Sequence, residues 1–292
     1  MDDGEFLAER FAEHRAHLRA VAYRMLGSLS EADDALQEAW LRASKAGTDE
    51  VRDFGGWLTT IVGRTCLNML RSRTRRAEEP LDAQAADPLI GSVGDPEQEA
   101  LMADSVGVAM LVVLDTLTPA ERLAFVLHDS FALPFEEIAP LLDRSPAATR
   151  QLASRARRRV KGATPLPDAD LTRGREIVTA FLAATRSGNL SALVTLLDPD
   201  VVLHADKFVL PTPAPLEVRG ATPVATGAMA AMDRARFTGL ALINGNVGLA
   251  MAPHGHLRIA LTFTIHHNKI TTITVIANPA HLTTLEITVL PD

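Results

Sequence analysis

The sequence has a single cysteine among its 292 residues and no apolar run long enough to cross a bilayer. One cysteine excludes an internal disulfide framework and is typical of a reducing compartment. Because a membrane-spanning helix needs about 20 predominantly apolar residues, the sequence predicts none. The segment Met1–Glu5 is acidic, whereas a secretory signal begins with basic residues. We therefore expect a cytoplasmic protein with no membrane partner.

The sequence also lacks a general excess of positive charge, since 29 Lys and Arg face 36 Asp and Glu, a formal net charge of −7. It has no internal repeat and no low-complexity tract. A hydrophobic content of 47% and a charged content of 22% are typical of a globular protein. The length allows two or three domains, each with its own core.

Against this acidic background, two helix-like segments end in clusters of arginine. The first, 57–76, has Leu58, Ile61 and Val62 at helical spacing before its arginines, and the second is 145–161. Arginine carries a permanent charge and a planar fork of donors that fits phosphates and guanine edges. Both segments therefore indicate nucleic-acid binding. The alternative is a solvated helix whose basic end interacts favourably with the helix dipole.

The second cluster follows a helix-turn-helix pattern. Thr118 and Pro119 give a helix-start signal, and Ser145-Pro146 gives another directly before the basic segment. Between them lies a short helix, 133–142, in which we expect Pro140 to bend or shorten the helix. A short helix, a tight turn and an arginine-rich helix are typical of DNA recognition.

Spacing divides the last of these helices into two faces. Leu152, Ala156 and Val160 are expected to pack inward. Because the N-terminal end of a recognition helix enters the major groove, we predict four base-reading residues: Thr149, Arg150, Gln151 and Ser154. Arg155 also faces outward, and we expect it to contribute to promoter selectivity together with Arg150. The cations nearer the C-terminal end are expected to contact phosphates: Arg157, Arg158 and Lys161.

An acidic helix precedes the first arginine cluster. Four of its residues gather within six positions: Asp33, Asp34, Gln37 and Glu38. A protein that contacts only DNA gains nothing from such an acidic face, whereas one that also binds a basic protein partner does. The segment 5–76 is predicted to be helical throughout.

With these segments in place, the chain resembles the sigma-70 family of bacterial RNA polymerase sigma factors, in its small extracytoplasmic-function group. The matching stretches are Ala22–Arg42, Phe54–Arg76 and Thr118–Arg159, in the family's order. They resemble the segments that dock on the polymerase clamp, read and separate the minus-ten element, and read the minus-thirty-five element. The chain departs from the family pattern at Arg64, Asn68, Asp143, Pro140 and Leu152, so the promoter sequence does not follow.

The resemblance assigns roles to two groups of residues. The acidic group becomes the polymerase-docking face: Asp33, Asp34, Gln37 and Glu38. The first basic segment becomes a DNA-binding surface: Arg64, Asn68, Arg71, Arg73, Arg75 and Arg76. The implied partners are core RNA polymerase and promoter DNA, with no cofactor and no metal.

The last third of the chain differs in character. A predicted helix, about 172–187, precedes strand-like segments such as 257–266 and 270–277, with a hairpin turn at 267–269. Nine Lys and Arg face eight Asp and Glu here, so this part has no basic bias. Its element order is similar to the SnoaL-like domain, a cone-shaped α+β fold that some sigma factors carry as a regulator in cis.

Three roles stay open for this domain: catalysis, small-ligand sensing and contact with protein. His204 and Asp206 stand at alternate positions near a strand end and are the candidate pocket residues. His254, His256 and His266 could approach one another and bind zinc, but solvent-facing imidazoles on a loop and strand are the favoured explanation. A fold by itself does not imply an activity, and we expect no catalysis.

The predicted architecture is therefore multidomain, with two all-α sigma domains and a C-terminal α+β domain. The boundaries are 1–78 for sigma region 2, 79–104 for a linker, 105–162 for the region 4 helix-turn-helix, 163–171 for a second linker and 172–292 for the SnoaL-like domain. The predicted function is promoter-specific transcription initiation with core polymerase. The alternative is a ligand-sensing DNA-binding regulator that works without replacing a sigma subunit.

Overall fold

The computed structural model describes residues 3–46, 51–77, 102, 106–162, 168–209 and 214–290. The chain divides by its internal packing into two units, Met1–Glu99 with Leu114–Arg158, and Ala100–Val113 with Arg159–Asp292. The predicted linker 79–104, apart from Met102, and residues 163–167 of the second linker lie outside the described residues. The predicted domain limits therefore stay predictions.

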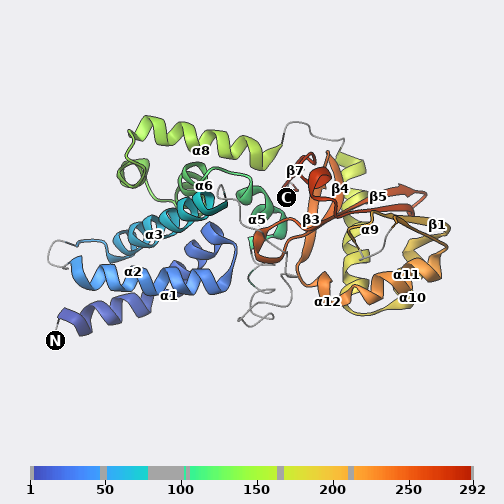
Figure 1. Ribbon diagram of the computed structural model, residues 1–292, viewed down its shortest axis with the longest axis horizontal. Helices are drawn as coiled ribbons and strands as arrows, with labels where there is room; N and C mark the ends of the chain where they lie inside the picture. Colours follow the sequence, from blue (N-terminus) through green and yellow to red (C-terminus); the bar gives the residue numbers. More distant parts are fainter. Residues whose placement is uncertain are drawn as a thin grey trace. The chain divides into compact units, whose positions relative to one another are not determined.

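The first unit begins with three long helices, α1 (Asp3–Leu26), α2 (Leu29–Ala46) and α3 (Phe54–Ala77). They pack against one another in all three pairs, as Figure 1 shows for the blue and cyan helices. The helical prediction for 5–76 is confirmed, with breaks after Leu26 and Ala46. Cys66 is completely buried, and burial raises the pKa of its thiol to about 12, so it is an apolar core residue at neutral pH.

The helix-turn-helix prediction is confirmed by α5 (Val108–Asp115), α6 (Pro119–Phe125), a π-helical turn (Val126–Ser130), α7 (Phe135–Ile138) and α8 (Pro146–Lys161). Thr118 caps α6 in a complete capping box with Glu121. After α7 the chain tightens into a 3-10 turn (Ala139–Leu142), so Pro140 shortens the α-helix as expected. Asp143 then adopts the left-handed conformation at φ 54°.

Within the first unit, α6 and the π-helical and 3-10 turns pack against α1 and α3. Glycine at position 63 of α3 allows this approach, because a Cβ there would stand 3.1 Å from a methyl of Leu127 and 3.3 Å from one of Leu123. The buried guanidinium of Arg122 donates to the carbonyl of Met25 at 2.9 Å and pairs with Asp115 at 3.1 Å. Helix α6 therefore contacts both α3, at Gly63, and α1, at Met25, and covers the core between them.

The second unit is built on a seven-stranded sheet of order β2-β1-β6-β5-β4-β3-β7. Its strands are β1 (Leu197–Ala205), β2 (Leu216–Arg219), β3 (Thr238–Ile243), β4 (Asn246–Met251), β5 (Ile259–His266), β6 (Lys269–Ile276) and β7 (Ile287–Thr288). Only β1 and β6 pair in parallel among these strands. The predicted hairpin is confirmed, since His267 and Asn268 adopt φ values of 48° and 64° between paired β5 and β6.

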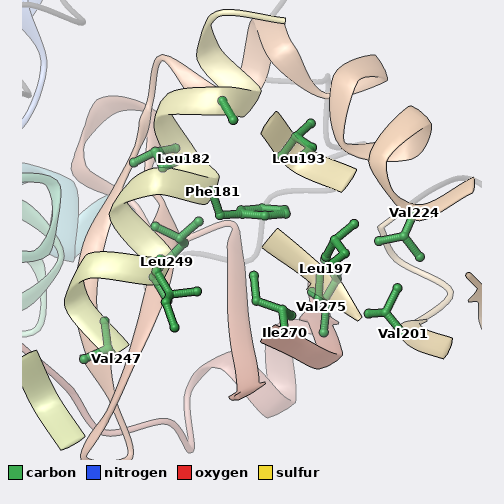
Figure 2. Packing of buried hydrophobic residues seen from close by; sticks show 14 of the residues in the cluster. Phe181, Leu182, Leu193, Leu197, Val201, Val224, Val247, Leu249, Ile270 and Val275 are labelled. Atoms are coloured by element: carbon green, nitrogen blue, oxygen red, sulfur yellow. The ribbon is translucent and has the colours of Figure 1, made fainter. Parts of the chain in front are cut away.

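Helices lie against the sheet: α9 (Asp168–Arg186), α10 (Leu190–Leu196), α11 (Ala221–Ala230) and α12 (Met232–Ala235). A short helix, α13 (Pro279–Leu282), follows β6. Figure 2 shows apolar side chains from α9, α10, α11 and the strands gathered in one cluster. Since α9 begins at Asp168, the last residues of the predicted linker 163–171 are helical. This unit therefore has the α+β layout that the SnoaL-like resemblance implied.

Candidate functional site

Helix α2 exposes most of the predicted docking residues. Its apolar side chains recur every three or four positions and are buried, which turns the residues between them outward. Asp34, Gln37 and Glu38 are exposed, whereas Asp33 is half-buried and accepts two hydrogen bonds of 2.9 Å from Arg19 of α1. Glu38 pairs with Arg42 one turn later at 2.9 Å. Asp34 has no ion pair among the described residues.

The four residues border two grooves. Asp33 and Gln37 line a groove of about 510 Å³ between α1 and α2, together with Trp40 and Leu41. The Leu41 side chain is 53% exposed. The charge pattern of α2 did not predict this apolar component, although the position of Leu41 on the polar face of an amphipathic helix indicated it. The docking surface is thus acidic with an apolar edge, a composition suited to a protein partner.

The other groove, of about 450 Å³, lies between α2 and α3 and brings the two predicted surfaces together. Asp34 and Glu38 line it from α2, and Asn68 and Arg73 line it from α3. Arg73 also forms an ion pair with Glu31 across the helices. The predicted DNA residue Arg73 therefore has a structural partner, and the acidic face directly adjoins the basic one.

Along α3 the predicted DNA residues form one exposed stripe. Arg64, Asn68, Arg71 and Arg75 are all exposed and stand at positions i, i+4, i+7 and i+11 of one helix face. At 1.5 Å per residue the stripe is about 16 Å long, which suits a series of phosphates along one strand. The side chain of Arg76 lies outside the described residues.

Helix α8 presents most of its predicted DNA residues to solvent. The hydroxyl of Ser145 accepts a hydrogen bond from the amide of Ala148 at 3.2 Å, which caps the helix as predicted. The inward face is also confirmed, because Leu152, Ala156 and Val160 are buried. The exposed set is Arg150, Gln151, Ser154, Arg155, Arg158 and Lys161, with Arg157 half-exposed.

Thr149 is a correction. It is completely buried, and its hydroxyl donates to the carbonyl of Ser145 at 3.1 Å. The buried stripe of α8 runs through Thr149, Ala153, Ala156 and Val160, so this threonine belongs to the packed face. The prediction that it reads a base is therefore wrong, because its polar atom already has a partner inside the fold.

Three of the exposed arginines have partners within the first unit. The guanidinium of Arg150 lies 5.2 Å from the ring centre of Phe135. The Nε of Arg155 donates to buried Glu121 at 3.0 Å, and Arg157 pairs with Asp129 at 2.5 Å. These contacts orient the side chains while leaving their other donors available. Arg158 and Lys161 have no such partner among the described residues.

His204 and Asp206 are a second correction, because neither lines the cavity of the second unit. Neighbouring Leu203 and Ala205 line it, and strand alternation places His204 on the opposite face. There the half-exposed imidazole stands 3.4 Å from Glu217. Asp206 follows the end of β1, where its carboxylate accepts backbone hydrogen bonds from Phe208, Ala277 and Asn278.

The environment of Asp206 assigns it a structural part. Partial burial acts to raise its pKa, but the three backbone donors outweigh that effect and hold the pKa below its ordinary value. The carboxylate therefore stays ionised and joins β1 to the segment after β6.

Across the described ranges, no group of three or more His, Cys, Asp or Glu side chains is arranged to hold a metal ion, including His254, His256 and His266. Nor is any described helix apolar and long enough to span a membrane.

Comparison with known proteins matches both helical segments to one family. The family model described as Sigma-70 region 2 matches residues 10–76, and that described as Sigma-70, region 4 matches residues 108–160. The chain is similar to ECF RNA polymerase sigma factor SigJ of Mycobacterium tuberculosis, with 36% identity over 94% of this chain and 92% of that protein. Probable ECF RNA polymerase sigma factor SigI of the same organism is 37% identical over 66% of this chain and 67% of its own length. Among solved structures, the crystal structure of Mycobacterium tuberculosis SigJ has 33% identity and a TM-score of 0.44, covering 94% of this chain and 98% of that one.

Proposed function

Because the chain belongs to the extracytoplasmic-function group of sigma-70 family RNA polymerase sigma factors, we propose that it binds core RNA polymerase and directs promoter-specific transcription initiation. The observation that supports this most directly is the pairing of opposite surfaces within the first unit. An acidic face on α2 borders the exposed basic stripe of α3, and α8 presents a second set of cations. A protein partner for the α2 face and one DNA element for each of the α3 and α8 surfaces would account for all three.

The division of labour follows from the chemistry of each surface. On α2, Asp34 and Glu38 attract a basic polymerase helix, and exposed Leu41 contributes apolar area at the contact. On α3, the stripe from Arg64 to Arg75 contacts the minus-ten DNA and stabilises its separated strands. On α8, Arg150, Gln151 and Ser154 stand in the first half of the helix, where base edges are read.

Nearer the C-terminal end of α8, three cations hold the phosphate backbone: Arg157, Arg158 and Lys161. The one-component regulator is not favoured, since family membership extends to the polymerase-docking region, which such a regulator does not need.

In vitro transcription with purified core polymerase tests the proposal. With the full-length protein, we expect transcripts that begin downstream of a shared pair of promoter elements, and none from core polymerase alone. The measurement is sequencing of transcript starts from a library of bacterial genomic fragments. Specific DNA binding without any complex with core polymerase would instead support the one-component regulator.

We further propose that the second unit modulates initiation in cis. It includes residues of both flanks of the helix-turn-helix. Val108, at the start of α5, stands over Gly239 of β3, so a Cβ there would lie 2.8 Å from that of Val108. At the end of α8, the carbonyl of Val160 accepts a hydrogen bond from Val289 at 3.2 Å. We infer that the sheet acts on the promoter-reading segment through these two contacts.

Replacing Gly239 with alanine is expected to change transcription from the cognate promoter severalfold. The new methyl overlaps Val108, and overpacking of this kind costs about 1–3 kcal/mol, which shifts the start of α5 from its seat on β3. The same replacement at Gly174 of α9 is the matched control, because its Cβ would meet Val247 at an ordinary 3.4 Å. Run-off transcription with equal amounts of folded protein is the measurement. Equal activity of the Gly239→Ala and wild-type proteins would contradict modulation through this contact.

A further inference from the structure

The second unit encloses an apolar cavity of about 340 Å³ between α9, α11, α12 and the sheet. Phe181 of α9, Leu249 of β4 and Val275 of β6, all visible in Figure 2, are among the side chains that line it. A cavity of this size lies at the lower end of the range that holds small organic ligands. Because liquid water occupies about 30 Å³ per molecule, the space corresponds to about eleven waters and to a ligand with on the order of ten non-hydrogen atoms.

The polar side chains of the wall are already engaged, apart from one. Thr185 donates its hydroxyl to the carbonyl of Phe181 at 2.9 Å, and Thr238 donates to the carbonyl of Arg234 at 3.1 Å. Of the described residues that line the cavity, none is Asp, Glu, His, Lys or Cys. The wall therefore offers no acid or base for catalysis and favours an aliphatic body.

Arg234 of α12 is the single charged residue among the described residues of this wall. Its side chain is half-buried and has no hydrogen bond or ion pair with any part of the chain that the structure describes. Its neighbour in sequence, Asp233, pairs instead with Arg236 at 3.0 Å. A half-buried guanidinium without a counter-ion at an apolar cavity has all five donors available for an anionic ligand.

We propose that this cavity binds a small lipophilic carboxylic acid, with its hydrocarbon body among the aliphatic side chains and its carboxylate on Arg234. A carboxylate carries one negative charge and matches the single cation bidentately, whereas a phosphate monoester brings about −1.5 to −2 charges at neutral pH. Binding of such an acid would be a property beyond the proposed sigma function. Because it is measured without polymerase or DNA, the result of the binding experiment does not depend on that function.

Isothermal titration of the full-length protein with octanoate tests the proposal. We expect saturable one-to-one binding and a rise in melting temperature. 1-Octanol has the same body without the charge, octylamine carries the opposite charge, and acetate has the head without the body. Each is expected to bind at least tenfold more weakly than octanoate. Octyl phosphate distinguishes a carboxylate site from a general anion site, and binding tighter than that of octanoate would overturn the proposal.

Two glutamine replacements form the matched pair of variants. Arg234→Gln should weaken octanoate binding at least tenfold, whereas Arg236→Gln should leave it unchanged, because Arg236 is outside the cavity wall and pairs with Asp233. Arg234→Lys keeps the charge and should retain part of the affinity for octanoate. It replaces Arg234→Gln as the test variant if the glutamine variant does not fold. Octanol binding as tightly as octanoate, equal losses in both glutamine variants, or no saturable octanoate binding would each overturn the proposal.

Discussion

Replacing both Asp34 and Glu38 with arginine is expected to abolish binding to core RNA polymerase while leaving the fold intact. The two carboxylates are exposed on one face of α2, four residues apart, and neither contributes to the apolar core. Close charge pairs across protein interfaces have coupling energies of about 1.5–7 kcal/mol, and reversal turns attraction into repulsion. A loss of about 3 kcal/mol already lowers affinity about a hundredfold. Co-purification and titration of labelled protein with core polymerase measure the effect.

The chain offers a closely matched control on α1. Glu9 and Glu13 are also exposed and four residues apart, and Glu13 pairs with Arg10 at 2.7 Å much as Glu38 pairs with Arg42 at 2.9 Å. The double replacement Glu9→Arg and Glu13→Arg makes the same change in net charge. We expect it to retain most of the polymerase affinity. Equal losses in the two double variants would show that net charge, rather than the α2 face, governs the association.

Replacing Arg150 with alanine is expected to remove discrimination at the upstream promoter element. A well-formed bidentate contact with a base is worth about 1–3 kcal/mol, or roughly five- to 150-fold in relative affinity. Arg150 is exposed in the first half of α8, where its guanidinium lies over the Phe135 ring. Competition binding between the cognate element and single-base variants measures the change.

Arg158→Ala provides the contrast on the same helix. Arg158 is exposed two turns later, where a phosphate contact is expected, so its loss should weaken binding to all sequences alike. It should also reduce the slope of log affinity against log salt by about 1. Thr149→Val should leave selectivity unchanged, because this threonine is buried. Loss of selectivity in Arg158→Ala with retention in Arg150→Ala would mean that α8 enters the groove by its other end.

Arg155 is a poorer test of base reading than its sequence position suggested. Its Nε donates to Glu121, whose side chain is only 7% exposed and also accepts from the hydroxyl and amide of Thr118. Truncating Arg155 removes a partner from a buried carboxylate, which costs stability in addition to any DNA contact. The partnership joins residues 34 positions apart, so no local pattern announced it.

The sequence by itself determined the features that depend on a few neighbouring residues. Caps at Thr118 and Ser145, the shortening at Pro140 and the left-handed Asp143 follow from interactions within about four positions. The helical period placed Leu152, Ala156 and Val160 in the core for the same reason. Motif order along the chain was sufficient to predict the sigma family and its acidic and basic surfaces.

The tertiary structure alone decided what each side chain meets. The edge of the buried stripe on α8 depends on the packing of α8 within the first unit, and that packing buried Thr149. The register of β1 in the sheet places Leu203 and Ala205 in the cavity wall and His204 on the opposite face. Asp206, just after the end of β1, accepts a hydrogen bond from the backbone after β6. The cavity itself, with Arg234 on its wall, is assembled from segments between Phe181 and Val275. Such features arise from contacts between residues far apart in the chain, and a local pattern carries no information about which distant surface will cover it.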